Sequence, residues 1–141
     1  MVILSRFAIA AAICLAASQS FAATTIKVSE DGEGGGPMTI KLEPATAKAG
    51  PVTFEVHNDA ASEEHEMVVV KLKSADQAIP FNKKKDRVDE KKLKSMGEVS
   101  DLKPGADGKL TVDLKAGTYL LLCNIKGHYS AGMHATLVVS P

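Results

Sequence analysis

Short segments with the period of a β-strand, separated by glycine and proline, run through most of the chain and constrain its fold more than any other feature. Apolar residues at Val52, Phe54 and Val56 alternate with polar ones, as expected for a strand that buries one face. Directly before them, Gly50 and Pro51 are residues typical of a turn. The repetition of this pattern predicts an all-β protein.

Eight such segments can be placed along the chain, a number typical of a β-sandwich or a β-barrel. No internal repeat accompanies them. The predicted strands cover residues 25–28, 38–42, 52–57, 66–72, 98–102, 109–114, 118–123 and 133–139.

Residues 74–96 depart from this pattern and show no clear strand period. Within them, the segment 83–94 (KKKDRVDEKKLK) has seven basic and three acidic residues, and a short helical turn is expected at 88–93. The favoured interpretation is a solvated excursion between strands. The alternative is a docking patch for an acidic partner.

The first 22 residues have the organisation of a secretory signal. Arg6 precedes an apolar run over 7–17, and the small residues Ser20 and Ala22 occupy the positions that a signal peptidase reads. The apolar run has about half of the roughly 20 residues that a membrane-spanning helix needs, so a membrane anchor is the weaker interpretation. The sequence thus predicts cleavage after 1–22, a single mature domain over 23–141, a periplasmic location and no membrane insertion of the mature chain.

Charge and composition exclude some classes of partner. The 17 basic and 17 acidic side chains cancel, so the chain has no net field that would attract a nucleic-acid backbone. Aromatic residues make up 4% of the sequence and tryptophan is absent, which removes the stacking residues of single-strand binders. Nucleic acid is therefore not the expected partner.

Removal of the signal changes the cysteine count. Cys14 leaves with the signal, so the mature chain has one cysteine, Cys123, in an oxidising compartment. An internal disulfide is then impossible. Cys123 must be an inert buried residue, a reactive thiol or a metal ligand.

The surroundings of Cys123 favour a metal ligand. A strand is predicted to end at Cys123; His128 follows after four residues and Met133 after four more. A loop between two adjacent strand ends can turn these three side chains toward one point. One thiolate, one imidazole and one thioether, joined by a second imidazole, make the ligand set of a trigonal copper site with a weak axial sulfur. Copper is favoured over zinc because methionine is a poor zinc ligand.

The second imidazole has three possible sources. His65 begins an apolar strand directly after a polar loop, which places it at a strand end beside the loops. His57 ends an alternating strand on its polar face, so a surface position is expected for it. His134 follows Met133 and should point to the opposite face of its strand. His65 is therefore the predicted ligand.

The sequence resembles the cupredoxins, the small blue copper proteins, on the pattern of Asn58, His65, GTYLLLC at 117–123 and CNIKGHYSAGM at 123–133. The spacing of the last three residues is similar to that of rusticyanins and auracyanins. The resemblance implies an eight-stranded Greek-key β-sandwich and one type 1 copper ion bound by His65, Cys123 and His128 with Met133 axial. It also implies single-electron transfer.

The same resemblance implies a monomeric electron carrier rather than an enzyme, with redox proteins such as c-type cytochromes or a membrane oxidase or reductase as partners. The competing interpretation is a periplasmic copper carrier or copper-tolerance protein that uses the same site to hold the metal. Glu66 departs from the pattern, because azurins and plastocyanins usually have at this position an Asn that braces the cysteine loop. A negative charge here predicts a lower reduction potential.

Overall fold

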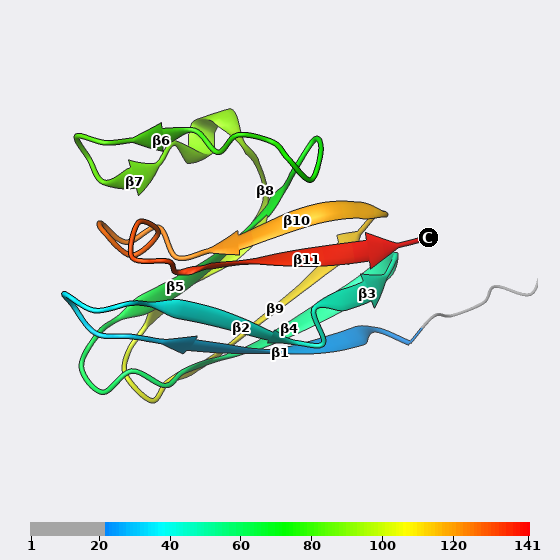
Figure 1. Cartoon of the computed structure of the whole chain (residues 1–141). Coiled ribbons are helices and arrows are strands. Elements are labelled where there is room, and N and C mark those ends of the chain that lie inside the picture. Colours follow the sequence, from blue (N-terminus) through cyan, green and yellow to red (C-terminus); the bar gives the residue numbers. More distant parts are fainter. Residues whose placement is uncertain (1–21) are drawn as a thin grey trace, which may run out of the picture.

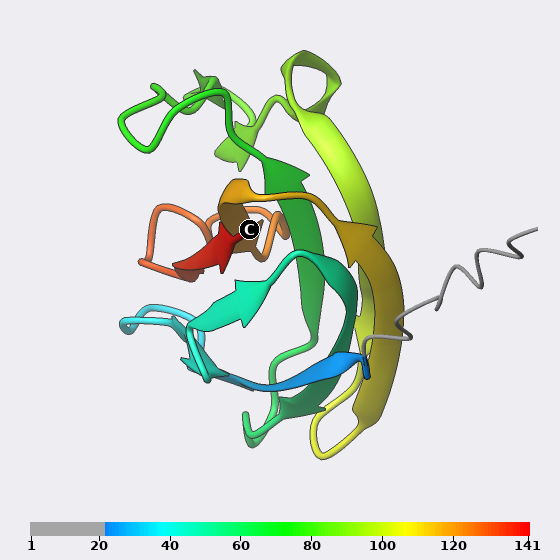
Figure 2. The same cartoon turned by 90° about the vertical axis from the view of Figure 1, so that its right-hand side faces the viewer.

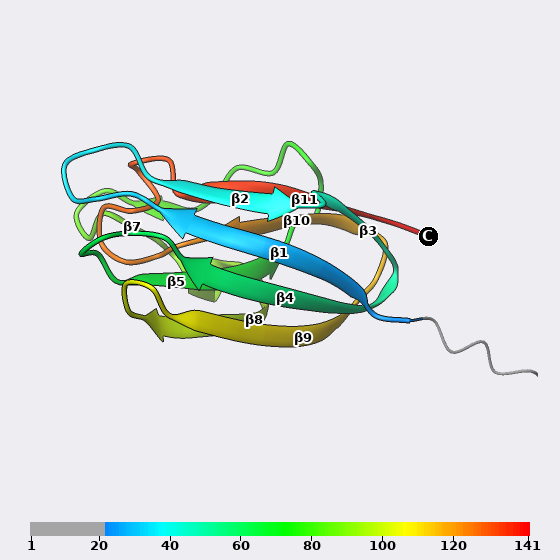
Figure 3. The ribbon, with the colours of Figure 1, turned by 90° about the horizontal axis from the view of Figure 1, so that it is seen from below.

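The computed structural model describes residues 22–141 as a sandwich of two β-sheets (Figures 1 and 2). The predicted signal 1–22 lies outside the described residues, apart from Ala22. Four strands form the first sheet in the order β2-β1-β4-β9, seen side by side in Figure 3: β1 (Thr24–Asp31), β2 (Thr39–Glu43), β4 (Gly50–Asn58) and β9 (Asp107–Leu114). The second sheet has the order β3-β11-β10-β5-β8: β3 (Thr46–Lys48), β5 (His65–Lys71), β8 (Lys94–Leu102), β10 (Gly117–Leu122) and β11 (His134–Ser140).

Both sheets are mixed, because each contains one parallel pair of strands among antiparallel ones. β1 runs parallel to β4, β11 runs parallel to β3, and the other strand pairs of the two sheets are antiparallel. Alternation along the strands places one set of apolar side chains between the sheets. This main core includes Ile26, Phe54, Met67, Tyr119 and Leu137, all without exposed surface. The all-β sandwich predicted from the sequence is confirmed.

The described part of the chain has eleven strands rather than the predicted eight. The additional strands are β3 and the short pair β6 (Phe81–Asn82) and β7 (Arg87–Val88), which form a small hairpin of their own. β8 also begins at Lys94, earlier than predicted. These strands are too short, or too rich in charged residues, for alternation to reveal them. The helical turn expected at 88–93 is present as a shorter 3₁₀ turn, η1 (Glu90–Lys92).

The segment 74–96 is not the solvated excursion that the sequence favoured. Its apolar residues cover the outer face of the five-stranded sheet and close a second core with Val68, Val70 and Leu122. β5 is therefore buried on both faces, which explains its nearly unbroken apolar sequence. The segment packs through Ile79, Phe81, Val88 and Leu93. Its lysines remain exposed, and their abundance conceals the apolar positions in the sequence.

Several loops gather at one end of the sandwich, on the left of Figure 1. The β1–β2 loop contacts the loop that follows β10 through a hydrogen bond from Met38 N to Ala131 O (3.0 Å). It also contacts the β4–β5 loop, where Gly34 N donates to Glu63 Oε1 (3.2 Å). Within residues 22–141, no helix is long and apolar enough to cross a membrane.

Candidate metal centre

His65, Cys123 and His128 meet at the loop end of the sandwich. Nδ1 of His65 lies 3.2 Å from Nδ1 of His128, and Sγ of Cys123 lies 3.4 Å from the same His128 nitrogen. One donor atom from each of the three residues falls within 4.8 Å of the others, and all three residues are buried. Three of the four residues predicted from the sequence are thus brought together.

The order of the strands explains how residues so far apart in sequence converge. β5 and β10 are antiparallel neighbours, with Val68 opposite Leu122, so the start of β5 and the end of β10 lie at the same end of the sheet. His65 is the first residue of β5, and Cys123 follows the last residue of β10. Both residues therefore lie at one end of two interior strands of the sheet rather than in a free loop.

The loop after β10 brings His128 back to this end of the sheet. Its turns are closed by main-chain hydrogen bonds, from His128 N to Ile125 O and from Ala131 N to Gly127 O, both 3.0 Å. Gly127 has φ +89°, in the left-handed region that favours glycine. The loop is held by its own backbone, so the imidazole has little freedom to move away from Cys123.

Met133 lies beside Cys123, directly before β11. Cys123 N donates to Met133 O (3.1 Å), and Met133 N donates to His128 O (3.0 Å). The Met133 side chain is fully buried and belongs to the same core cluster as Cys123. The backbone thus places the thioether residue next to the three donor residues, while its role as axial ligand stays a prediction.

The donor set fits a soft or borderline metal ion. Metal bonds of about 2.0–2.3 Å to nitrogen and sulfur put neighbouring donor atoms roughly 3–4 Å apart, as the 3.2 and 3.4 Å distances are here. The second nitrogen of His65, Nε2, is buried and makes no hydrogen bond of good geometry to any described residue. A thiol and two imidazoles gathered in this way are chemically suited to copper.

Burial sets the protonation states of the three residues. It lowers the pKa of both His65 and His128, so that their imidazoles are neutral and free to coordinate. It raises the pKa of the Cys123 thiol to about 12. The thiolate therefore forms when a cation takes the place of the proton, as expected of a coordinating thiol.

Glu66 supplies a brace for the cysteine loop although it departs from the family pattern. Its Oε1 accepts a hydrogen bond from the backbone N–H of Asn124 (3.1 Å), directly after Cys123. The backbone N–H groups of Ile125 and Glu66 in turn lower the pKa of the Cys123 thiol, against the larger effect of burial. A carboxylate thus holds the loop in place, and it brings a negative charge close to the site.

Comparison with known proteins agrees with this geometry. The family model for the sulfocyanin (SoxE) domain matches residues 10–141. The chain belongs to the sulfocyanin family. Sulfocyanins are cupredoxins, so the resemblance stated from the sequence is confirmed, and the expected cofactor, one type 1 copper ion, agrees with both the family and the donor set. No curated protein matches the chain.

Solved structures share the fold of this sulfocyanin-family chain. Auracyanin from Roseiflexus castenholzii is 21% identical, with a TM-score of 0.59 over 86% of this chain and 100% of its own. Auracyanin A from Chloroflexus aurantiacus, a "blue" copper protein, is 21% identical, with a TM-score of 0.55 over 82% of this chain and 99% of its own. Rusticyanin from Thiobacillus ferrooxidans is 17% identical, with a TM-score of 0.58 over 85% of this chain and 80% of its own.

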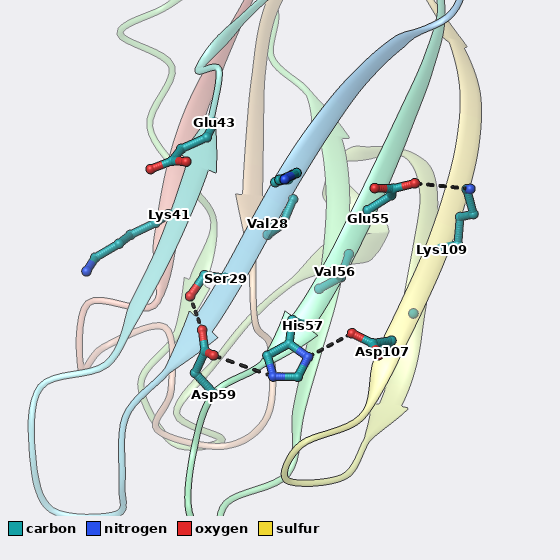
Figure 4. Close-up of a pocket in the computed structure, with 12 residues that line it drawn as sticks. Val28, Ser29, Lys41, Glu43, Glu55, Val56, His57, Asp59, Asp107 and Lys109 are labelled. Atoms are coloured by element: carbon teal, nitrogen blue, oxygen red, sulfur yellow. Dashed lines mark hydrogen bonds and ion pairs between the residues drawn. The ribbon is translucent and has the colours of Figure 1, made fainter.

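The other two histidines lie outside the site, as predicted. His134 is exposed and its ring lies 4.8 Å from that of Tyr129. His57 lies on the outer face of the four-stranded sheet and pairs with Asp107 (Nδ1 to Oδ1, 2.7 Å) and Asp59 (Figure 4). It lines a groove of about 730 Å³ whose charged groups largely pair with one another, as Lys109 does with Glu55. The groove is separate from the metal centre.

Two residues near the site were missed from the sequence. Glu30 is fully buried on the inner face of β1, with no hydrogen bond from its carboxyl group to any described residue. Alternation with Ile26 and Val28 could have placed it inside. Asn124 joins the cysteine loop to Val88, with Val88 N donating to its Oδ1 (2.7 Å) and its Nδ2 donating to Val88 O (3.0 Å). No sequence signal indicates this contact, because the two residues lie in separate segments.

Proposed function

We propose that this protein carries single electrons between redox partners by means of one copper ion, which His65, Cys123 and His128 would hold together with Met133. One observation carries the proposal: three soft or borderline donor atoms lie within 4.8 Å of one another in a buried site of a sulfocyanin-family chain. When bound, copper supplies a reversible one-electron change that a mixed nitrogen and sulfur ligand set accommodates in both oxidation states.

The contribution of the protein is rigidity. His65 and Cys123 lie at the ends of two interior strands of a sheet, and the His128 loop is closed by its own hydrogen bonds. Packing of the described residues, 22–141, is enough to bring the donor atoms together. The ligands therefore need to move little when the charge of the site changes. Small reorganisation favours fast electron exchange.

Exposure assigns different roles to the two imidazoles. His65 and Cys123 have no exposed surface, whereas His128 keeps 6%. Among these three donor residues, His128 is therefore the route between the buried site and a docked partner. The thiol of Cys123 has no exposed surface, which suits electron exchange through the His128 imidazole rather than a reaction at sulfur.

The proposal includes location and partners. An exported protein working in the periplasm agrees with the signal-like residues 1–22 and with a single unpaired cysteine in the mature chain. Redox proteins such as c-type cytochromes, or a membrane oxidase or reductase, are the proposed partners of the monomer.

Visible spectroscopy during copper titration tests the metal site. We expect an intense thiolate-to-copper band that saturates at one equivalent and is absent from Cys123→Ala. His57→Ala is the matched control, since it removes a histidine outside the cluster and should keep the band. Loss of the band in the control, or its persistence in Cys123→Ala, would refute the assigned ligands.

A second measurement separates electron transfer from copper storage. An electron carrier exchanges electrons rapidly with a haem protein and keeps its copper in the presence of a chelator. A copper carrier gives up the metal readily and exchanges electrons slowly. The rigid, buried donor set favours the first outcome.

A further inference from the structure

The β6–β7 hairpin stands directly against the loop that holds His128 (Figure 1). Gly127 N donates to Asp86 O (3.0 Å), and the Ser130 hydroxyl donates to the Asp86 carboxylate (2.8 Å). The Phe81 ring lies 5.8 Å from that of Tyr129, the residue after His128. The hairpin is thus fixed beside the residue through which electrons are proposed to leave.

The hairpin and the ligand loop carry a group of exposed basic side chains, which we call the basic rim. All of its members are exposed, and within residues 22–141 none forms an ion pair; the five residues are Lys83, Lys84, Lys85, Arg87 and Lys126. The acidic residue among them, Asp86, is already engaged by the ligand loop. The positive charge of the rim is therefore free to act on another molecule.

The opposite side of the same end is acidic. Glu33 receives hydrogen bonds from Ser62, and Glu63 receives one from Gly34, which links the β1–β2 and β4–β5 loops on the His65 side. A chain with no net charge thus has a strongly polarised end, with His128 next to the positive side.

We propose that the basic rim docks an acidic surface of a protein redox partner and turns that partner so that His128 faces its cofactor. The inference rests on the proposed electron transfer. A uniformly anionic membrane fits less well, because it would also face the acidic loops beside His65. A protein with acidic and neutral patches can match both sides.

The basic rim is expected to raise the rate of association with the partner rather than the stability of the complex. Exposed ion pairs contribute little individually, but a cluster of like charges beside the contact steers encounter and raises the association rate. Salt should remove this advantage, because charges more than about 10 Å apart are screened at 0.1 M ionic strength.

The test compares two triple variants of the copper-loaded protein with equal changes in net charge. One is Lys83→Glu, Lys84→Glu and Lys85→Glu in the rim. The control is Lys27→Glu, Lys41→Glu and Lys48→Glu, three exposed lysines on β1, β2 and β3. Stopped-flow oxidation is measured with an anionic probe, hexacyanoferrate(III), and a cationic probe, tris(phenanthroline)cobalt(III).

We expect the rim variant to react about tenfold more slowly with the anionic probe at low salt and faster with the cationic probe, with both differences lost at high salt. The control variant should change each rate less than about twofold. Equal effects of the two variants, or effects that salt leaves unchanged, would overturn the inference. If copper did not cycle at all, the proposed function itself would fail.

A binding measurement tests the protein partner without relying on copper chemistry. In NMR titration with poly-L-glutamate, backbone amides of the hairpin and of Lys126 should shift in the wild type and stay in place in the rim variant. Vesicles containing phosphatidylglycerol form the second arm. Rim-dependent binding to the vesicles with no response to poly-L-glutamate would overturn the assignment to a protein.

Discussion

Glu30 shows how one residue can make stability depend on pH. Its carboxyl group has no exposed surface and no hydrogen bond to any described residue, which is costly for a charged group. Burial, together with the charge of Glu66, raises the pKa of Glu30 from 4.5 to about 8. The folded protein thus holds this proton over a range in which the unfolded chain has released it.

The free energy of unfolding of the metal-free protein should therefore fall as pH rises from about 4.5 to about 8. Below this window Glu30 is protonated in both states, and above it the group is ionised in both. Glu30 contributes at most about 1.4 kcal/mol per pH unit to the slope of the free energy of unfolding against pH. Urea denaturation of Glu30→Gln should show a flatter profile, whereas exposed Glu43→Gln should leave it unchanged. A profile unaffected by Glu30→Gln would contradict this origin.

Glu66 is the residue expected to tune the reduction potential. Its carboxylate lies beside the cysteine loop and favours the more highly charged state of the site. Glu66→Gln keeps an oxygen that can accept the Asn124 hydrogen bond but removes the negative charge. The reduction potential should therefore rise by roughly tens of millivolts, because about 1.4 kcal/mol corresponds to 59 mV for one electron. Redox titration measures it, with Glu43→Gln as control. A potential that did not rise would remove this role.

At the scale of elements, the segment 74–96 couples the second core to the metal loop. Its apolar residues cover β5 and β10, and Asn124 joins it to the ligand loop through both the N–H and the C=O of Val88. Asn124 Nδ2 also donates to Glu90 Oε1 (2.5 Å). This amide side chain therefore adds to the contacts of Asp86 that position the hairpin against the site.

Asn124→Ala should release this segment. The change leaves buried backbone groups of Val88 without partners, which costs about 2–3 kcal/mol. Hydrogen exchange should become faster at Val88 and across 79–93. Ser130→Ala, which removes an exposed contact to the same hairpin, should cost less than about 0.5 kcal/mol. Equal exchange in the two variants would show that the apolar contacts alone hold the segment.

For the whole molecule, metal binding and folding are linked, because the donor residues come from two strand ends and a loop that converge when the sandwich is folded. Copper at about a thousand times its dissociation constant should stabilise the protein by about 4 kcal/mol and raise Tm by roughly 15 °C. Calorimetry with and without copper measures the shift. Cys123→Ala should lose most of it, and a shift retained in that variant would place the binding elsewhere.

Several features of this protein were determined by its sequence alone. Alternation predicted the strands, because the side-chain period of a strand is a local property of the backbone. The chemical types and spacing of Cys123, His128 and Met133 predicted a ligand loop, because the loop is one short segment. His65 could be chosen because it begins a strand after a polar loop.

Tertiary structure decided the rest. The distance from His65 to His128 depends on β5 and β10 being antiparallel neighbours, and strand order is not a local property. The covering of β5 by residues 74–96 and the burial of Glu30 likewise depend on which segments pack together. The alternation of apolar residues along a strand indicates which of its faces is buried. Which segment covers that face is decided by the packing of the whole chain.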